Sequence, residues 1–294
     1  MVYDESGCCF QYECQCICVV HGDPHYETFD GTYYDFQGNC SYVLVKEIIP
    51  KYNFSVNSDN YYCNTGVSCL ESITVFYKSF EIFMITNLIY VNQEQVFPFF
   101  ENDDFRITVN GIKTVLVIPD IDARISFGGF RFRIDLPWNL FHGNTEGQCG
   151  TCNNRQKNDC RLPNGTIDSS CSDMAHYWYV PEKNNTKCVP PGPPDPPDPL
   201  CDPAICKVIH SKVFEECRKI IPYETYVTSC IFDVCHLNST SAGCTSLETY
   251  ADKCLQERIC IDWRAFTDGQ CEYVCEDPKT YDACGTNIEL TCDT

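Results

Sequence analysis

Hydrophobic and polar positions alternate over much of residues 33–140, as they do in β-strands that bury one face. Strand-like segments lie at residues 42–45, 73–77, 105–109 and 130–136. The pairs Asn110-Gly111 and Gly128-Gly129 separate such segments, and these residues tolerate the positive φ that a tight hairpin turn requires. Residues 19 to about 180 therefore predict an antiparallel β-sandwich.

A proline-rich stretch follows this region. Residues 189–200 hold seven prolines, which neither donate to a sheet nor continue a helix. We expect an extended spacer at a domain boundary.

Beyond the spacer the apolar period becomes helical. Apolar residues recur every four positions from Ile205 to Ile221, after Asp202-Pro203, a pair typical of a helix start. A second helix is expected to begin at Thr245, because Thr245 and Glu248 have the spacing of a capping box. One face of that helix would carry Leu247, Tyr250, Ala251 and Cys254.

Composition then restricts the class of protein. The 294 residues include 25 cysteines, 41 acidic and 21 basic side chains, for a formal net charge of −20. So many cysteines indicate disulfides and secretion, and exclude an ordinary cytosolic enzyme. The negative charge argues against nucleic acids and anionic membranes as partners, and no apolar run is long enough for a membrane span. We expect a piece of a larger secreted, extracellular protein.

Five N-glycosylation sequons support passage through a glycosylating compartment. Their asparagines are Asn39, Asn53, Asn164, Asn184 and Asn238.

Three motifs carry a family resemblance. Residues 16–31 read CICVVHGDPHYETFDG, residues 147–152 read GQCGTC, and residues 260–264 read CIDWR. The chain resembles a von Willebrand factor type D assembly over nearly its whole length, and is most similar to the fourth, C-terminal assembly of secreted gel-forming mucins.

The resemblance implies a multi-domain, mainly β protein. A cysteine-rich segment (1–18) would precede a type D antiparallel β-sandwich (19–188). After the proline-rich linker (189–200), a small disulfide-rich helical eight-cysteine module (201–274) and the start of a trypsin-inhibitor-like module (275–294) would follow.

Gly22-Asp23-Pro24-His25 is the first candidate site. The carboxyl of Asp23 can attack its own main-chain carbonyl and release Pro24, and His25 is placed to carry the proton. The resemblance implies self-cleavage between Asp23 and Pro24 in some mucins, leaving a reactive end. The alternative is an intact turn before a strand.

The second candidate site is the loop at residues 149–160, whose oxygen-bearing side chains suit calcium. The resemblance implies a calcium site built from Asp30, Asn153, the Arg155 carbonyl, Asn158 and Asp159. The alternative is a solvated turn closed by a disulfide between Cys152 and Cys160.

The odd number of cysteines leaves at least one thiol without a partner inside the chain. Cys8 and Cys9 are the candidates for an intermolecular disulfide, and the alternative is a truncated module whose Cys284 or Cys292 has lost its partner. Cysteine spacing does not favour zinc. Motifs of hydrolases and nucleotide-binding proteins are absent from the sequence.

The leading hypothesis is a non-enzymatic structural segment of a secreted gel-forming mucin. It would contribute to polymer assembly and mucus gel formation near the C-terminal dimerisation region, with other mucin chains as partners and a homodimer as one form. The alternatives are an autoproteolytic module that cuts at Asp23-Pro24 and an adhesive or clotting-factor-like binding module.

Overall fold

The computed structural model describes residues 15–64, 66–86, 88–97, 99–110, 113–128, 130–181, 201–275 and 281–284, and the backbone of residues 2–3 and 10–11. The chain divides into two compact units, residues 1–195 and 196–294. Their boundary falls inside the expected spacer 189–200. This spacer, Cys8, Cys9, Asn184, Gly111 and Gly129 lie outside the described residues.

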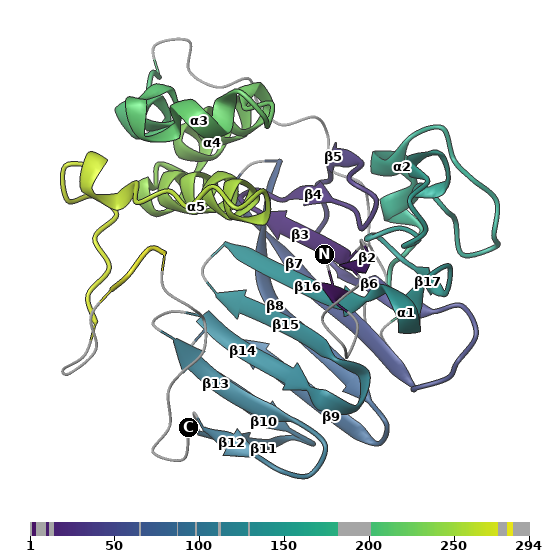
Figure 1. The fold of residues 1–294 in the computed structure, drawn as a ribbon. Helices are drawn as coiled ribbons and strands as arrows, with labels where there is room; N and C mark the ends of the chain where they lie inside the picture. The colour runs from purple at the N-terminus through teal and green to yellow at the C-terminus, as the bar shows by residue number, and fades with distance from the viewer. Residues whose placement is uncertain are drawn as a thin grey trace. The chain divides into compact units, whose positions relative to one another are not determined.

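Unit 1 consists of antiparallel sheets, as the alternating pattern predicts (Figure 1). The seven-stranded sheet has the order β11-β10-β9-β8-β7-β6-β17. Its strands are β6 (Ser41–Glu47), β7 (Phe54–Asn64), β8 (Val67–Tyr77), β9 (Phe80–Ile85), β10 (Leu88–Val91), β11 (Glu94–Val96) and β17 (Thr145–Glu146).

The eight-stranded sheet has the order β12-β13-β14-β15-β16-β3-β4-β5. Its strands are β3 (Gln15–His21), β4 (His25–Glu27), β5 (Tyr33–Asp35), β12 (Phe100–Glu101), β13 (Arg106–Asn110), β14 (Lys113–Ile118), β15 (Ala123–Gly128) and β16 (Arg131–Pro137). A separate two-stranded pair joins β1 (Val2–Tyr3) to β2 (Phe10–Gln11).

Side chains from both large sheets form one hydrophobic core. Leu44 and Ile73 of one sheet and Ile125 and Ile134 of the other are fully buried. The predicted sandwich is confirmed: two of the four strand-like segments lie within β6 and β8, and the other two overlap β13 and β16. Burial of alternate positions is the physical reason, since the side chains of a strand point to opposite faces in turn.

The N-terminal strand β3 pairs with β16, with Cys18 opposite Ile134 and Cys16 opposite Leu136. Two disulfides, Cys16–Cys152 and Cys18–Cys149, then join β3 to the segment after β17. Short helical turns complete the unit: 3₁₀ helices η1 (Pro119–Ile121) and η2 (Gln156–Asn158), and helices α1 (Trp138–Phe141) and α2 (Cys171–His176).

Unit 2 is helical and has a core of its own. Its elements are the 3₁₀ helices η3 (Ala204–His210), η4 (Lys212–Phe214) and η5 (Arg264–Phe266) and the α-helices α3 (Glu215–Arg218), α4 (Glu224–Leu237) and α5 (Thr240–Gln256).

The first helix prediction was right about the buried face and wrong about continuity. Ile205, Ile209 and Cys217 are buried as expected. The backbone breaks at Ser211, which is extended (φ −68°, ψ 166°), so that η3, η4 and α3 replace one helix. Asp202 does not cap the first turn, because its carboxylate pairs with Lys207. An apolar period of four is therefore also met by consecutive short turns.

The second helix begins five residues before the predicted start. Thr245 lies inside α5, where its hydroxyl donates to the carbonyl of Ser241 at 3.0 Å. A helix interior offers such a carbonyl four residues back, and the hydroxyl uses it instead of capping an N-terminus. The predicted buried face is confirmed by Leu247, Tyr250 and Cys254.

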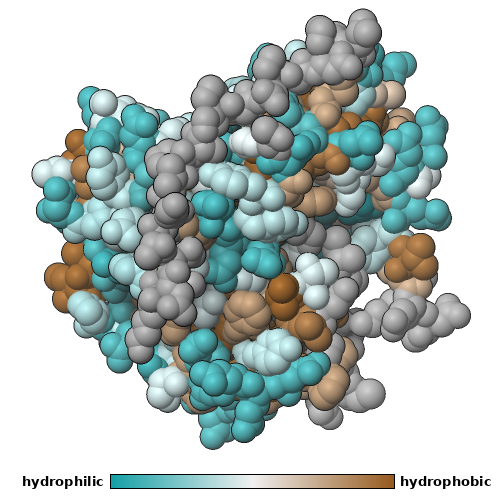
Figure 2. Space-filling view, turned by 180° about the vertical axis from the view of Figure 1, so that it is seen from behind, coloured by the Kyte–Doolittle hydropathy of each residue, from teal (hydrophilic) through white to brown (hydrophobic). Residues whose placement is uncertain are grey.

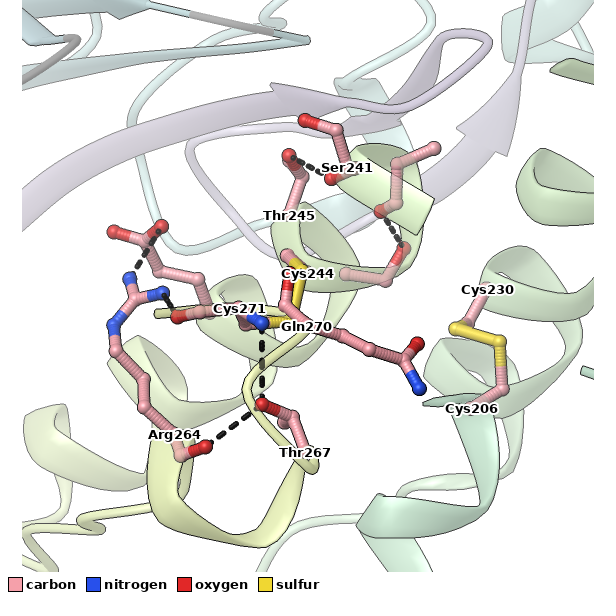
Figure 3. Close-up of a disulfide and its surroundings, with 12 residues drawn as sticks. Cys206, Cys230, Ser241, Cys244, Thr245, Arg264, Thr267, Gln270 and Cys271 are labelled. Carbon is pink, nitrogen blue, oxygen red and sulfur yellow. Dashed lines mark hydrogen bonds and ion pairs between the residues drawn. A yellow bond between two sulfur atoms is a disulfide. The ribbon is translucent and has the colours of Figure 1, made fainter. Parts of the chain in front are cut away.

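Four disulfides fasten the helices of unit 2: Cys201–Cys235, Cys206–Cys230, Cys217–Cys254 and Cys244–Cys271. Figure 3 shows Cys244–Cys271 with Arg264 beside it. Nη1 of Arg264 donates to the carbonyl of Cys271 at 2.9 Å, and Nη2 pairs with Glu248 at 3.3 Å. Arg264 thus connects α5 to the segment that follows η5.

A fifth disulfide, Cys260–Cys284, reaches into the expected third module. Cys275 is a free cysteine. The remainder of that module lies outside the described residues.

Candidate functional sites

The turn at residues 22–25 connects β3 to β4. His21 and His25 are paired across this hairpin, and the Gly22 N–H donates to the carbonyl of Phe130 at 2.9 Å. Asp23 is completely buried, and its Oδ1 lies 3.2 Å from Nε2 of His25. The structure thus brings together the two side chains to which the sequence assigns proton and nucleophile chemistry.

His25 also contacts Asp35 on β5, with Nδ1 lying 2.6 Å from Oδ1. The Asp35 side chain is 64% exposed, whereas that of His25 is 5% exposed. A protonated imidazole donates from both nitrogens, so it can hold both carboxylates at once.

Gln37 is a residue of this site that the sequence did not reveal. Its Nε2 donates to the main-chain carbonyl of Asp23 at 2.6 Å, which is the carbonyl of the Asp23–Pro24 bond. Its Oε1 accepts from the Ser68 N–H at 2.6 Å, which orients the amide. No local motif marks Gln37, because only the fold places it against the turn.

His21 lies beside His25, with 5.3 Å between ring centroids. It is 1% exposed, and neither ring nitrogen has a hydrogen-bond partner in the described part of the chain. Burial lowers the pKa of His21 well below its usual value, and the positive charges of His25 and Arg131 lower it further. His21 is therefore neutral at physiological pH.

The cysteines around the second site pair differently from the expected Cys152–Cys160 closure. Cys152 is bonded to Cys16, and Cys160 to Cys171. The prediction was wrong because sequence proximity does not determine disulfide partners. The fold places β3 against residue 152, and α2 against residue 160.

Asp30 organises the backbone of this loop. Its carboxylate accepts from the N–H groups of Asn153 at 3.0 and 3.2 Å, Asn154 at 2.9 Å and Arg155 at 2.7 Å. The Arg155 carbonyl accepts from the Asn158 N–H at 3.1 Å. Asp30 therefore joins the predicted loop although more than 120 residues separate them in sequence.

Asp159 is the buried charge of the loop. Its Oδ2 accepts from the hydroxyls of Thr28 at 2.7 Å and Thr32 at 2.6 Å. Burial raises the pKa of Asp159 to about 6, the two threonine hydrogen bonds oppose this rise, and the charge of Asp30 adds to it. The threonines were not predicted, since they precede the loop by more than a hundred residues.

Three buried oxygens in the loop have no hydrogen-bond partner within the described residues: Oδ1 of Asn153, of Asn158 and of Asp159. Buried polar atoms are usually satisfied, so such a group needs a partner. Amide and carboxylate oxygens are the donors that calcium prefers. The donor set therefore fits a hard cation.

Two glycines hold this region against the sheet. Gly147 has φ 133°, and a Cβ there would lie 2.5 Å from the carbonyl oxygen of Leu44. Gly150 has φ 74°, and its Cβ would lie 2.8 Å from Oδ1 of Asp159. The glycines of the GQCGTC motif therefore permit close approach and a left-handed backbone.

The four described sequon asparagines are exposed: Asn39, Asn53, Asn164 and Asn238. Figure 2 shows that most of the coloured surface on one face is hydrophilic, with hydrophobic residues in small separate groups. Within the described residues, none of the helices combines the length and hydrophobicity needed to cross a bilayer.

Comparisons with known proteins agree with this architecture. The von Willebrand factor type D domain matches residues 18–166, and the C8 domain matches residues 205–272. The chain therefore belongs to the von Willebrand factor type D family, and the expected resemblance is confirmed.

Several of the similar proteins are mucins. The chain is 38% identical to Mucin-5AC and to Mucin-2 of Homo sapiens, in each case over 99% of its own length. It is also 38% identical to an intestinal mucin-like protein of Rattus norvegicus over 99% of the chain. The chain spans 6% of the length of each human protein and 37% of the rat protein. These relatives and the disulfides support the expected secreted location.

Proposed function

We propose that the chain is a structural, disulfide-bonded segment of a secreted gel-forming mucin that carries load within the polymer and contributes to its assembly. Similarity to mucins over 99% of the chain is the observation on which the proposal rests. The covalent connectivity of the two units supplies the physical argument for load bearing.

In unit 1 the Cys16–Cys152 disulfide bypasses most of the β-sandwich. Tension that enters at residue 15 and leaves at residue 181 crosses from β3 to residue 152 through sulfur. The Cys160–Cys171 disulfide bypasses a further part of the path. The strands between Cys16 and Cys152 are therefore relieved of force.

Unit 2 is protected throughout its described length. The pairs Cys201–Cys235, Cys217–Cys254, Cys244–Cys271 and Cys260–Cys284 overlap in sequence. Every point between Cys201 and Cys284 is therefore spanned by at least one disulfide. A segment with this connectivity transmits tension without extending far.

Single-molecule force extension tests the load-bearing role. With the whole chain tethered at its ends, reduction is expected to lengthen the extended polypeptide by at least about 460 Å, because Cys16–Cys152 encloses 136 residues. In the matched control Cys63→Ala/Cys69→Ala, the lost disulfide lies inside the loop that Cys16–Cys152 closes, so the extended length of the oxidised chain is expected to stay the same. Equal lengths before and after reduction contradict the proposal.

Assembly is tested separately by mass in solution. We expect a disulfide-linked oligomer with other copies of the chain under non-reducing conditions, and its loss in Cys8→Ser/Cys9→Ser. An oxidised chain that is strictly monomeric, with every other thiol paired internally, contradicts the cross-linking role. The load-bearing role is then tested by the force measurement alone.

A second function, self-cleavage at Asp23-Pro24, has support from the turn at residues 22–25. A carboxylate oxygen of Asp23 would attack the main-chain carbonyl carbon of Asp23 and form a cyclic anhydride. The bond to Pro24 then breaks as its nitrogen takes a proton, and water or another nucleophile opens the anhydride. His25 lies 3.2 Å from the Asp23 carboxylate, and Gln37 donates to the carbonyl on which negative charge would develop.

Incubation of the chain near pH 5, followed by sequencing of new N-termini, tests this function. We expect a product beginning at Pro24, and a rate lower by on the order of 10²-fold in Gln37→Leu, which removes the donor. Gln156→Leu, at an exposed position, is the matched control. His25→Ala is expected to slow cleavage as well. Absence of a Pro24-initiated product contradicts the function.

We also propose that the loop at residues 149–160 holds calcium. The oxygens of Asn153, Asn158 and Asp159 that lack hydrogen-bond partners support this. Calorimetric titration of the whole chain with Ca²⁺ is expected to show one site, lost in Asp159→Asn and retained in Asp168→Asn. A chain without heat of binding, or with binding unchanged in Asp159→Asn, contradicts the site.

A further inference from the structure

A row of charged and ionisable side chains crosses the eight-stranded sheet of unit 1. Strands β16, β3, β4 and β5 are consecutive neighbours in that sheet (Figure 1). Arg131 of β16 is paired with His21 of β3, and His21 is paired with His25 of β4. His25 is in turn paired with Asp35 of β5. Because directly opposed residues of neighbouring strands share a face of the sheet, the four side chains form one continuous row.

The two ends of the row differ in exposure and in charge. Arg131 and His21, at one end, are 6% and 1% exposed. Asp35, at the other end, has a side chain that is 64% exposed. The row therefore runs from a buried guanidinium, which stays protonated, to a carboxylate in contact with solvent, and the two imidazoles lie between them.

The buried end of the row keeps positive charge away from His21. Burial lowers the pKa of His21 well below its usual value, and the charges of His25 and Arg131 lower it further. Since the guanidinium of Arg131 cannot lose its proton, it disfavours a second positive charge beside it. A proton that enters the row therefore resides on His25 and not on His21.

The exposed end of the row favours a proton on His25. Nδ1 of His25 lies 2.6 Å from Oδ1 of Asp35, a distance short enough for a charge-assisted hydrogen bond. An imidazole that donates from Nδ1 to a carboxylate presents Nε2 to its other partner. That partner is Asp23, whose Oδ1 lies 3.2 Å from Nε2. Tyr33 of β5 packs against the same imidazole, with 6.1 Å between ring centroids.

We infer that Asp35 is a positioning residue of the self-cleavage site: it holds His25 protonated, with the Nε2–H directed at Asp23. This inference rests on the self-cleavage proposed above. When the bond between Asp23 and Pro24 breaks, the nitrogen of Pro24 takes a proton, and the protonated imidazole beside the turn is placed to supply it. The transfer leaves His25 neutral, with its Nδ1–H still donating to Asp35.

The consequence of this arrangement lies in the pH dependence of cleavage. The reaction requires Asp23 as a carboxylate and His25 as an imidazolium, so its rate rises with pH as Asp23 loses a proton and falls as His25 loses one. The carboxylate of Asp35 favours the imidazolium, because opposite charges in contact stabilise each other. Loss of that carboxylate therefore moves the falling limb of the profile to lower pH and leaves the rising limb in place.

Rates of formation of the Pro24-initiated product, measured from about pH 4 to about pH 8 in the whole chain, test this role. In Asp35→Asn the falling limb is expected to move down by about one pH unit, which makes the rate about tenfold lower at pH values above the limb. Asp35→Glu, which keeps the carboxylate, is expected to keep the original profile. Asp120→Asn, which removes a 56% exposed carboxylate paired with Lys78, is the matched control and leaves the profile unchanged.

Nitrogen NMR of the histidine rings gives a second measurement, which does not depend on cleavage. It follows the protonation of His25 directly in the Gln37→Leu background, in which cleavage is expected to be slow. Addition of Asp35→Asn is expected to lower the pH at which His25 is half protonated by about one unit. Addition of Asp120→Asn is expected to leave that pH unchanged.

The outcomes separate this inference from the function on which it rests. Absence of the Pro24-initiated product in the unsubstituted chain contradicts self-cleavage, and the protonation of His25 measured by NMR then decides the role of Asp35. Cleavage whose falling limb stays in place in Asp35→Asn, or a half-protonation pH of His25 that this substitution does not lower, overturns the inference.

Discussion

The two disulfides between β3 and residues 149–152 are expected to stabilise unit 1 in a strongly non-additive way. Cys16–Cys152 and Cys18–Cys149 join the same two segments, with sequence separations of 136 and 131. Either bond alone closes the long loop. The second bond closes only a small ring of about seven residues in the unfolded chain.

The magnitudes follow from the entropy of loop closure. The long loop contributes about 5 kcal/mol and the small ring about 2.4 kcal/mol. Removing one disulfide by a pair of Cys→Ala substitutions is therefore expected to cost about 2.4 kcal/mol through the unfolded state. Removing both costs about 7.4 kcal/mol, so the coupling between them is on the order of 3 kcal/mol.

A double-mutant cycle measures this coupling in the whole chain. The variants are Cys16→Ala/Cys152→Ala, Cys18→Ala/Cys149→Ala and the combination of all four substitutions. Urea unfolding is followed by hydrogen exchange of the β16 amides, so that unit 2 does not contribute. Cavities left by the lost sulfurs cost free energy in the single and the combined variants alike and largely cancel in the cycle. Costs that add to within about 0.5 kcal/mol refute the reasoning.

Three further outcomes are expected. Gly147→Ala forces a Cβ to 2.5 Å from a backbone oxygen and is expected to cost about 3 kcal/mol in thermal unfolding, whereas Gly143→Ala, with φ 67° and open space, costs about 1 kcal/mol; equal losses contradict the steric argument. Burial lowers the pKa of His21, so the neutral imidazole contributes stability fully above the unfolded pKa of about 6.5, and the free energy of unfolding falls below that pH by up to about 1.4 kcal/mol per pH unit. Urea titrations of His21→Leu should show a smaller loss of stability between pH 7 and pH 5 than those of the unsubstituted chain. The same pH dependence in both chains contradicts this role of His21. Arg264→Lys loses the planar guanidinium that donates to the Cys271 carbonyl and lies 4.4 Å from the Trp263 ring. It should lower the stability of unit 2 by about 2 kcal/mol, measured by urea unfolding followed through hydrogen exchange of α5. Unchanged exchange in α5 contradicts this expectation.

The sequence predicted a large part of the fold because its signals are local. The strand-like segments at residues 42–45 and 130–136 carry many apolar side chains for a core, and the structure has β6 and β16 there. The same principle identified the buried face of α5 through Leu247 and Tyr250. Helix ends were less predictable, since the capping pattern at Thr245 is equally compatible with a helix interior.

The candidate sites divide in the same way. Asp23 and His25 are neighbours in sequence, and a hairpin keeps them together. Gln37 approaches the Asp23 carbonyl only through the packing of the segment after β5. Thr28 reaches Asp159 only because the two ends of the type D domain meet.

By itself, the sequence determined the family, the β-to-helix change and the reliance on disulfides, because composition, periodicity and motif order are properties of the chain alone. The tertiary structure decided which cysteines are joined and which polar side chains meet a buried carbonyl or carboxylate. These features depend on contacts between residues far apart along the chain, and such contacts arise only when the sheets close on a shared core.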